Sequence, residues 1–407
     1  MDKHETSAPD ATSQPAASWL TARMLDVAGR ISQGTLILRL PDGDQYRVDG
    51  EADGPLGELH IHDLRMFRRF LIGGGVGFAE SYMDGDWDSP DLAALLGLFA
   101  LNEQVFKDRM AGTFWFALFN RLQHWRNRNT KSGAQRNIHA HYDLGNRFYS
   151  AWLDTSMTYS SGLFSEGAND LEGAQRAKYA SLARHIEVGP DQDVLEIGCG
   201  WGGFAEFVAG EIGARVTGIT ISKEQYAYAA ERIQKAGLND RVELRLQDYR
   251  DVEHGRFDRI ASIEMFEAVG REYWPTYFTK VRDALKPGGV AGLQIITIAD
   301  QYFDNYRRSV DFIQRYVFPG GMLPSPQALS EQFRQAGLVK RAERAFGPCY
   351  AETLAVWNRR FQQVWPELRG QGFDTRFKRL WDYYLAYCEA GFRAGCTDVV
   401  QVAVARS

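Results

Sequence analysis

A strand-helix alternation in the second half of the chain constrains its fold more than any other feature. From about residue 175, short apolar segments of strand length alternate with longer segments of helical periodicity. The first strand candidates are DVLEIG, ARVTGIT, RVELRLQD and FDRIASIEM, and the last are GVAGLQIITI, LVKRAERAF and DVVQVAVAR. This pattern is typical of βαβ units, which form a parallel sheet with helices on both faces. We predict a seven-stranded, doubly wound, Rossmann-like α/β sheet with an insertion at about 300–325.

The first of these strands ends in the glycine-rich loop VLEIGCGWGG. Gly198, Gly200 and Gly203 satisfy the pattern G-x-G-x-x-G, which by itself suggests a dinucleotide on a helix N-terminus. A dehydrogenase, however, uses an acid at the end of the second strand to bind a ribose, and here GITISKEQ places Thr220 first. The loop therefore fits a nicotinamide dinucleotide poorly.

A carboxylate, Glu196, stands immediately before the glycines, and the bulky Trp201 lies among them. A carboxylate is a poor neighbour for a diphosphate but a good one for the sulfonium and ammonium groups of S-adenosylmethionine. Glycines also allow the close backbone approach that this ligand needs. We predict an S-adenosylmethionine site; the alternative is a glycine turn that only packs a helix on a strand.

Composition narrows the remaining possibilities. A chain of 407 residues suggests two or three domains, and its net charge of −5 points to no nucleic-acid partner. Four scattered cysteines imply neither a disulfide framework nor a metal site, so a reducing cytoplasm fits. No apolar run approaches the roughly 20 residues of a membrane-spanning helix, and the N-terminus does not resemble a signal peptide. We expect any bilayer contact to be peripheral.

The N-terminal part divides into three predicted regions. Residues 1–17 are expected to be a disordered tail. Residues 18–104 are expected to form a small mixed α+β domain, in which GTLILRLPDGDQYRVDG gives two strands around a Pro-Asp-Gly turn, followed by helices interrupted by a glycine loop. Residues 105–136 carry seven basic residues against one acid, interleaved with aromatics. This segment is either a linker helix packing on a neighbour or a membrane-surface helix.

Seven motifs together resemble one family. HYDLGNRFY, MTYSSGLF, VLEIGCGWGG, GITISKEQ, DYRD, MFEAVG and FPGGMLPS follow the order found in the cyclopropane-fatty-acyl-phospholipid synthases, which include the mycolic-acid cyclopropane synthases. The resemblance runs from residue 137 to 407 and implies a methyltransferase domain there. It also implies transfer of a methyl group from S-adenosylmethionine to the cis double bond of an acyl chain in a membrane phospholipid.

The resemblance assigns residues to the donor and to proton removal. For the donor it implies Tyr142, Tyr159, Ser160, Gly198, Gly200 and Gly202, then Thr220 and Gln225 near the ribose and Asp248 and Tyr249 near the adenine; to these our reading of the loop adds Glu196. Tyr142 or Tyr159 can offer an aromatic face to the sulfonium. The alternative for either tyrosine is a core aromatic whose hydroxyl bonds locally.

Proton removal in the family usually uses a bicarbonate ion held by a cysteine, a glutamate, a histidine and a tyrosine. Glu267 and Tyr350 match this set, whereas Ser161 and Gln294 replace the cysteine and the histidine. Serine and glutamine still hydrogen-bond an anion, so two readings remain: bicarbonate at an altered site, or proton removal by Glu267 or Tyr350. The product is then a methyl-branched unsaturated chain or a cyclopropane.

Two other functions remain at this stage. A small-molecule N- or O-methyltransferase would share the sheet but not the full set of motifs, and an inactive lipid-binding homologue would tolerate the two replacements. The resemblance further implies a homodimer that works in the cytoplasm, peripherally on the inner face of the membrane.

Overall fold

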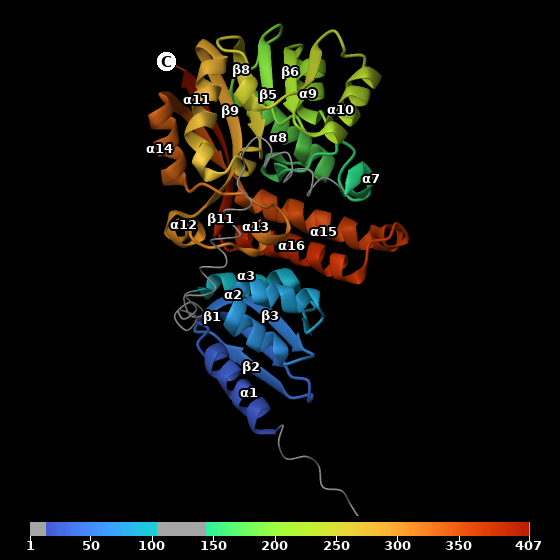
Figure 1. The fold of residues 1–407 in the computed structure, drawn as a ribbon, viewed down its shortest axis with the longest axis vertical. Helices are drawn as coiled ribbons and strands as arrows, with labels where there is room; N and C mark the ends of the chain where they lie inside the picture. Colours follow the sequence, from blue (N-terminus) through green and yellow to red (C-terminus); the bar gives the residue numbers. More distant parts are fainter. Residues whose placement is uncertain (1–13, 104–143, 407) are drawn as a thin grey trace, which may run out of the picture. The chain divides into compact units, whose positions relative to one another are not determined.

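The chain forms two compact units, Met1–Phe116 and Ala117–Ser407. Its computed structural model describes residues 14–103 of the first unit and 144–406 of the second (Figure 1). The basic segment at 105–136 and Tyr142 lie outside these residues, so the predictions made for them stay predictions. The predicted domain boundaries at 104 and 136 fall in the same undescribed stretch and remain predictions too.

The first unit contains a four-stranded sheet of order β2-β1-β3-β4. Its strands are β1 (Gln33–Arg39), β2 (Gln45–Asp49), β3 (Ala52–Ile61) and β4 (Trp87–Asp88), and its helices are α1 (Gln14–Ala28), α2 (Arg65–Met83) and α3 (Leu92–Leu101). The strands β1 and β2 pair antiparallel on either side of the expected turn. Strand β3, which was not predicted, runs parallel to β1.

Two details of this unit differ from the sequence-based expectation. Helix α1 begins at Gln14, within residues 1–17, which were expected to be a disordered tail. The expected glycine loop is a kink inside α2, where Gly74 has a φ of 58° and a ψ of −144°. Only glycine adopts this conformation readily, so the kink marks where the helix changes direction.

The second unit contains the predicted seven-stranded sheet, in the order β10-β11-β9-β8-β5-β6-β7. The strands are β5 (Asp193–Ile197), β6 (Arg215–Thr220), β7 (Val242–Leu246), β8 (Phe257–Ile263), β9 (Leu285–Ile298), β10 (Leu338–Ala345) and β11 (Thr397–Arg406). Strands β5 to β9 pair in parallel, and β11 runs antiparallel to both β9 and β10. The predicted fold class is confirmed.

Helices connect these strands. The longer ones are α8 (Leu171–His185), α10 (Lys223–Lys235), α11 (Trp274–Ala284), α14 (Pro326–Ala336), α15 (Gly347–Gly370) and α16 (Thr375–Arg393). The shorter ones are α7 (Gly145–Ser150), α9 (Gly203–Phe207), α12 (Asp300–Tyr306) and α13 (Phe312–Tyr316), with single turns at Phe164–Glu166, Val208–Ile212, Tyr249–Asp251, Phe266–Ala268 and Arg271–Tyr273. Helices α12 and α13 form the predicted insertion, and α15 packs along α16 (Figure 1).

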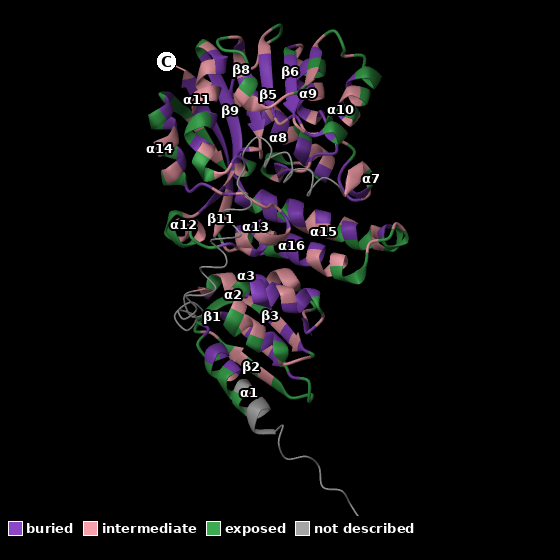
Figure 2. Cartoon of the chain, in the orientation of Figure 1, coloured by how far each residue is buried: buried purple, intermediate pink, exposed green. Residues whose placement is uncertain are grey.

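Both faces of the sheet are buried along the central strands β5, β6, β9 and β11, whereas the edge strands β7 and β10 are partly exposed (Figure 2). Successive residues of β5 point to opposite faces: Val194 packs with Phe204 of α9, whereas Leu195 packs in the cluster that contains Phe278 of α11. Because β6 and β7 lie to one side of β5 and β8 lies to the other, the strand order reverses between β5 and β8. In open α/β sheets, ligands bind at the carboxyl ends of the strands beside such a reversal.

Candidate functional site

The glycine loop follows β5 at this reversal point. Gly198 has a φ of 81°, and a Cβ there would lie 2.7 Å from Cγ of Met265, in the segment that follows β8. Gly202, with a φ of 86°, is the N-cap residue of α9. Gly200 has a φ of 52°, and a Cβ added to it would meet no atom of the described residues within 4 Å, so these residues leave space open above the loop. The loop thus needs glycine for its backbone and leaves room for a ligand.

Glu196, at the end of β5, fits a cationic ligand. Its side chain is only 3% exposed, and its Oε2 has no hydrogen-bond partner among the described residues. Burial raises the pKa of Glu196 well above its usual range, against the opposing charge of Lys178. An unpartnered buried carboxylate oxygen is costly unless a ligand satisfies it. An ammonium or sulfonium group would do so.

The predicted ribose and adenine residues lie at the carboxyl ends of β6 and β7. The Thr220 hydroxyl donates to Oε1 of Gln225 at 3.0 Å, at the start of α10. After β7, Asp248 accepts hydrogen bonds from the backbone and the guanidinium of Arg250. Burial raises the pKa of Tyr249 to about 12, so its phenol stays protonated. These residues border the edge that carries the glycine loop.

Tyr159 and Ser160 bind partners within the protein. The Tyr159 hydroxyl lies 2.7 Å from that of Tyr384, and its ring packs 5.2 Å from that of Trp357. The Ser160 hydroxyl accepts a 2.6 Å hydrogen bond from Nζ of Lys178. The local hydroxyl bond expected of a core tyrosine is therefore present at Tyr159, although the residue is only half-buried.

A carboxylate that the sequence reasoning passed over, Glu264, lies directly after β8. Its Oε1 accepts hydrogen bonds from the backbone N–H of Ser161 at 2.9 Å and from Nε2 of Gln294 at 2.7 Å. Its Oε2 accepts one from the hydroxyl of Tyr350 at 2.6 Å. Three of the four residues predicted to handle the proton therefore converge on Glu264.

A second layer of hydrogen bonds fixes the amide of Gln294. Gln294 on β9 faces Gln401 on β11, and both side chains are fully buried. Nε2 of Gln401 donates to Oε1 of Gln294 at 3.0 Å, and Oε1 of Gln401 accepts from the Ser181 hydroxyl at 2.7 Å. With its oxygen engaged by Gln401, Gln294 presents only N–H groups to Glu264.

The backbone and the pKa of Glu264 are both unusual. Its φ of 47° lies in the left-handed region, which costs a non-glycine residue about 1–2 kcal/mol. Burial raises the pKa of Glu264, while hydrogen bonds from Tyr350, Ser161 and Gln294 and the charge of Lys178 oppose the rise. Strain of this kind concentrates at functional sites.

Glu267, the predicted acid of MFEAVG, has a different environment. Its Oε1 accepts the backbone N–H of Ile296 at 2.6 Å, and its Oε2 has no partner among the described residues. Burial, together with the negative charge of Glu264, raises the pKa of Glu267 to about 8. With this pKa, Glu267 is mostly protonated at neutral pH.

Two further points refine the predicted set. The Ser161 hydroxyl donates to the carbonyl of Gly162 at 2.9 Å, so the contact with the acid comes from the Ser161 backbone instead of its side chain. Lys178, fully buried on α8, was not singled out from the sequence. Burial lowers the pKa of Lys178 to about 8, and the nearby Glu264, Asp154 and Glu196 oppose that shift.

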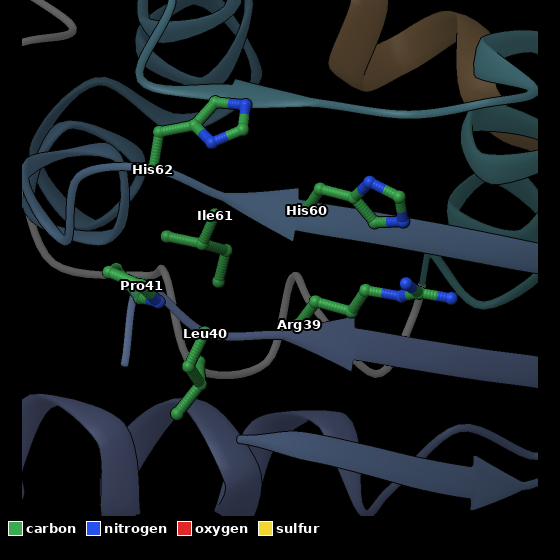
Figure 3. A pocket seen from close by; sticks show the side chains of 6 residues that line it. All are labelled: Arg39, Leu40, Pro41, His60, Ile61 and His62. Carbon is green, nitrogen blue, oxygen red and sulfur yellow. The ribbon is translucent and has the colours of Figure 1, made fainter. Parts of the chain in front are cut away.

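A hollow of about 300 Å³ also exists in the first unit, at the ends of β1 and β3 (Figure 3). Its lining includes Arg39, His60 and His62. His60 and Arg39 both contact Glu58, and His62 lies 2.9 Å from Asp88. The hollow contains none of the predicted site residues, and its polar groups are paired with surface carboxylates.

Similarity to known proteins agrees with this geometry. The mycolic acid cyclopropane synthetase family matches residues 129–402. The tuberculostearic acid methyltransferase of Mycobacterium tuberculosis is 38% identical over 396 residues, covering 94% of this chain and 91% of that protein. The cyclopropane-fatty-acyl-phospholipid synthase of Escherichia coli K12 is 36% identical over 385 residues, covering 90% and 95%. Among solved structures, the cyclopropane synthase MmaA2 from M. tuberculosis has a TM-score of 0.63 at 29% identity, covering 67% of this chain and 98% of that one.

Proposed function

The chain belongs to the mycolic acid cyclopropane synthetase family, and from this premise we propose that it methylates the cis double bond of an acyl chain already esterified in a membrane phospholipid. At the coarser level, it is an S-adenosylmethionine-dependent methyltransferase that acts on lipid double bonds. The proposal adds the phospholipid substrate and a product, a methyl-branched unsaturated chain.

The site at the carboxyl ends of β5, β6 and β7 carries the proposal. S-adenosylmethionine supplies an electrophilic methyl group on a cationic sulfur. The residues that would hold it are Glu196, Gly198, Gly200, Gly202, Thr220, Gln225, Asp248 and Tyr249, with Tyr159 and Ser160 from the segment before α8 and, from the undescribed stretch, Tyr142. The observation that supports this role best is the buried oxygen of Glu196 that has no hydrogen-bond partner among the described residues, four positions before the Gly200 backbone over which these residues leave open space.

Aromatic packing beside the acid cluster suits a cation formed on a hydrocarbon chain. An alkene is a weak nucleophile, so the protein must align it and keep water away from the cation. Tyr350 stacks on Phe392 at 4.5 Å, and Tyr159 packs against Trp357. Phe312 on α13 is 2% exposed and packs against Tyr383, which supports a role in the core.

Two observations support the finer parts of the proposal. The similarity to the phospholipid synthase of E. coli spans 90% of this chain, so the similar region includes part of the first unit. The similarity to MmaA2, in contrast, covers 67% of this chain. For the product, the replaced bicarbonate contacts at Ser161 and Gln294 favour a base that differs from the family's, and the position of the base decides which proton leaves.

Product analysis with a methyl-deuterated donor tests the proposal. Loss of a proton from a neighbouring chain carbon leaves all three deuteriums on the new methyl group and gives a branched alkene. Ring closure removes one deuterium and leaves two. We expect fatty acids with three deuteriums by mass spectrometry, from vesicles of unsaturated phospholipid. Two retained deuteriums would show that the proton leaves from the transferred methyl group, and would exclude a branched alkene formed by loss of a chain proton.

We further propose that the enzyme is a homodimer that acts peripherally at the inner face of the cytoplasmic membrane. No helix in the described ranges, 14–103 and 144–406, is long and apolar enough to cross a bilayer. Co-sedimentation with anionic vesicles tests membrane binding, and a protein that stays in the supernatant at low salt contradicts it. Light scattering of the protein as it elutes from a size-exclusion column tests the dimer, and the mass of a monomer contradicts it.

A further inference from the structure

We propose that the carboxylate of Glu264 is a built-in proton acceptor that takes the place of a diffusible bicarbonate ion. The inference rests on the proposed function, since it assigns the base for the same methyl transfer. It adds a fourth candidate to the sequence-based options, which were bicarbonate, Glu267 or Tyr350. The structure assigns the role to a residue that lies three positions before Glu267.

The hydrogen-bond donors around Glu264 carry the argument. Ser161, Gln294 and Tyr350 occupy the positions at which the family resemblance implies contacts with bicarbonate, and all three donate to Glu264 at 2.6–2.9 Å. A carboxylate resembles bicarbonate in its planar, delocalised pair of oxygens. A bicarbonate ion here would find these donors engaged and would face a second negative charge. The residues present therefore do not fit the ion.

The pattern of hydrogen bonds identifies the accepting atom. A carboxylate offers about four lone-pair sites, two on each oxygen. Both sites on Oε1 are used, by Ser161 and Gln294, whereas the hydroxyl of Tyr350 uses one site on Oε2. No hydrogen bond from a described residue uses the second lone-pair site on Oε2. We expect the proton to arrive there.

The surrounding network favours the ionised form that a base must have. Gln294 is held by Gln401, which is held in turn by Ser181. A buried amide in this orientation donates to a carboxylate and cannot accept from a protonated one. The backbone N–H of Glu264 also donates to the carbonyl of Gln294 at 2.8 Å, which fixes the acid relative to β9.

The backbone supports a functional reason for glutamate at this position. With a φ of 47°, residue 264 has a conformation that glycine adopts more easily. Glu187, Asp191 and Met157 also have positive φ, but Glu187 and Asp191 are exposed, and the described part of the chain gives them no comparable set of buried donors. The strained backbone is retained at a carboxylate that accepts hydrogen bonds from three donors. A catalytic role for this carboxylate accounts for the strain.

The step balances without a further reactant. The π electrons of the alkene form a bond to the methyl carbon as the bond between sulfur and that carbon breaks, which releases S-adenosylhomocysteine and leaves a carbocation on the chain. A C–H bond next to the cation then breaks, and its electron pair forms the new double bond. The proton bonds to Oε2 of Glu264, which becomes neutral and later passes the proton to solvent.

Variants of Glu264 and the supply of bicarbonate test this role. We expect the wild-type rate, measured as S-adenosylhomocysteine released with vesicles of unsaturated phospholipid, to be the same in carbonate-free buffer and in added bicarbonate. Glu264→Gln should lower kcat by about 100-fold or more, because a positioned general base contributes about that much. Glu264→Gly should be equally slow in carbonate-free buffer but should regain activity with added bicarbonate, which enters the vacated space. Glu264→Gln, which fills that space, should not respond.

Glu187→Gly is the matched control, because it makes the same change at the same backbone conformation on the surface. It should keep the wild-type rate and show no response to bicarbonate. Calorimetry with S-adenosylhomocysteine should give wild-type affinity for Glu264→Gln, which establishes that the variant is folded. A wild-type rate that requires bicarbonate, or a Glu264→Gln rate within threefold of wild type, overturns the proposal.

Bicarbonate binding gives a readout that does not depend on finding the lipid substrate. In ¹³C NMR spectra of labelled bicarbonate, we expect the wild-type protein to leave the bicarbonate resonance unbroadened and Glu264→Gly to broaden it clearly. If the wild-type protein broadens this resonance, and S-adenosylhomocysteine does not abolish the broadening, a bicarbonate site is intact and the inference is contradicted. Absence of methyl transfer by wild type on every unsaturated lipid, with this binding result intact, would instead contradict the proposed function.

Discussion

The two halves of the seven-stranded sheet use their polar residues in different ways. At the ends of β6 and β7, the contacts are local: Thr220 bonds Gln225, and Asp248 bonds Arg250, over separations of five and two residues. Around β8, β9 and β11 the contacts are distant, since Glu264 bonds Tyr350 and Ser161 over 86 and 103 residues. The donor half is built from short motifs and the acid half from tertiary packing.

This difference leads to a division of labour that variants can test. Changes in the donor half should alter the affinity for S-adenosylmethionine and leave the rate at saturation nearly unchanged. Changes in the acid half should alter the rate and its pH dependence and leave the affinity nearly unchanged. A variant of either half that affected both quantities equally would weaken the comparison.

Gly198→Val should have the largest effect, on donor binding. A Cβ at Gly198 would lie 2.7 Å from Met265, at a φ of 81° that β-branched residues avoid. The loop relieves the strain and overpacking by moving in the free protein, and restoring the geometry that binds the donor costs about 3 kcal/mol, or about 100-fold in Kd. Calorimetry measures this change. Gly237→Val, at a φ of 69° with open space around it, is the control and should keep the wild-type Kd.

Tyr350→Phe should lower kcat by about 10- to 100-fold, because a hydrogen bond to a charged group is worth about 1.5–3 kcal/mol. The substitution should also shift the pH dependence of activity. The Tyr350 hydroxyl lowers the pKa of Glu264, so its loss raises that pKa further. Activity that needs the ionised acid is lost as pH falls through its pKa, so the acid limb should shift to higher pH. An unshifted limb with a lower rate would assign Tyr350 a merely structural role.

Glu267→Gln should change how stability depends on pH. Because the pKa of Glu267 is raised from 4.5 to about 8 in the folded protein, its contribution to stability is complete below pH 4.5 and is lost as pH rises through 8. The variant has no carboxyl group at this position, so it does not lose this stability. As pH increases from 5 to 8, the free energy of unfolding of the variant should therefore rise relative to that of wild type, by at most about 1.4 kcal/mol per pH unit. Urea unfolding at several pH values measures it, with Glu224→Gln on the exposed face of α10 as the control variant.

Asp248→Asn should have the smallest effect, about 1 kcal/mol or a fivefold rise in Kd for the donor. The charge lost at this position is partly engaged by Arg250, which limits the change. The rate at saturating donor should stay within twofold of wild type. Steady-state kinetics with varied donor separates the two quantities, and a fall in the saturated rate of tenfold would place Asp248 in the acid half.

The same contrast explains what could be predicted from the sequence. The sheet, the glycine loop and Glu196 follow from periodicity and from a few adjacent residues. Glu264 was missed because the motif MFEAVG was read from Met265 onward, although an acid directly after a strand, at the same sheet edge as Glu196, was a usable signal. The buried Lys178 gave no signal, since lysine on a helix is usually solvent-exposed.

Ser161 illustrates a limit on reading site residues by type. The sequence suggested that a serine hydroxyl replaces a cysteine thiol as a donor to the anion. In the fold, the backbone N–H of Ser161 makes that contact, and its hydroxyl bonds Gly162. Any residue other than proline supplies this N–H, so the identity of the side chain says little about the site. The position of the backbone is set by tertiary packing.

The central claim, methyl transfer to an unsaturated acyl chain, is tested most directly by labelling. Full-length protein is incubated with S-adenosylmethionine carrying a ¹⁴C-methyl group and with vesicles of either cis-unsaturated or fully saturated phospholipid, and the released fatty acids are counted separately from the headgroups. The account predicts label in the fatty acids from the unsaturated vesicles alone. Label in the headgroup fraction, or equal labelling of saturated chains, would contradict it.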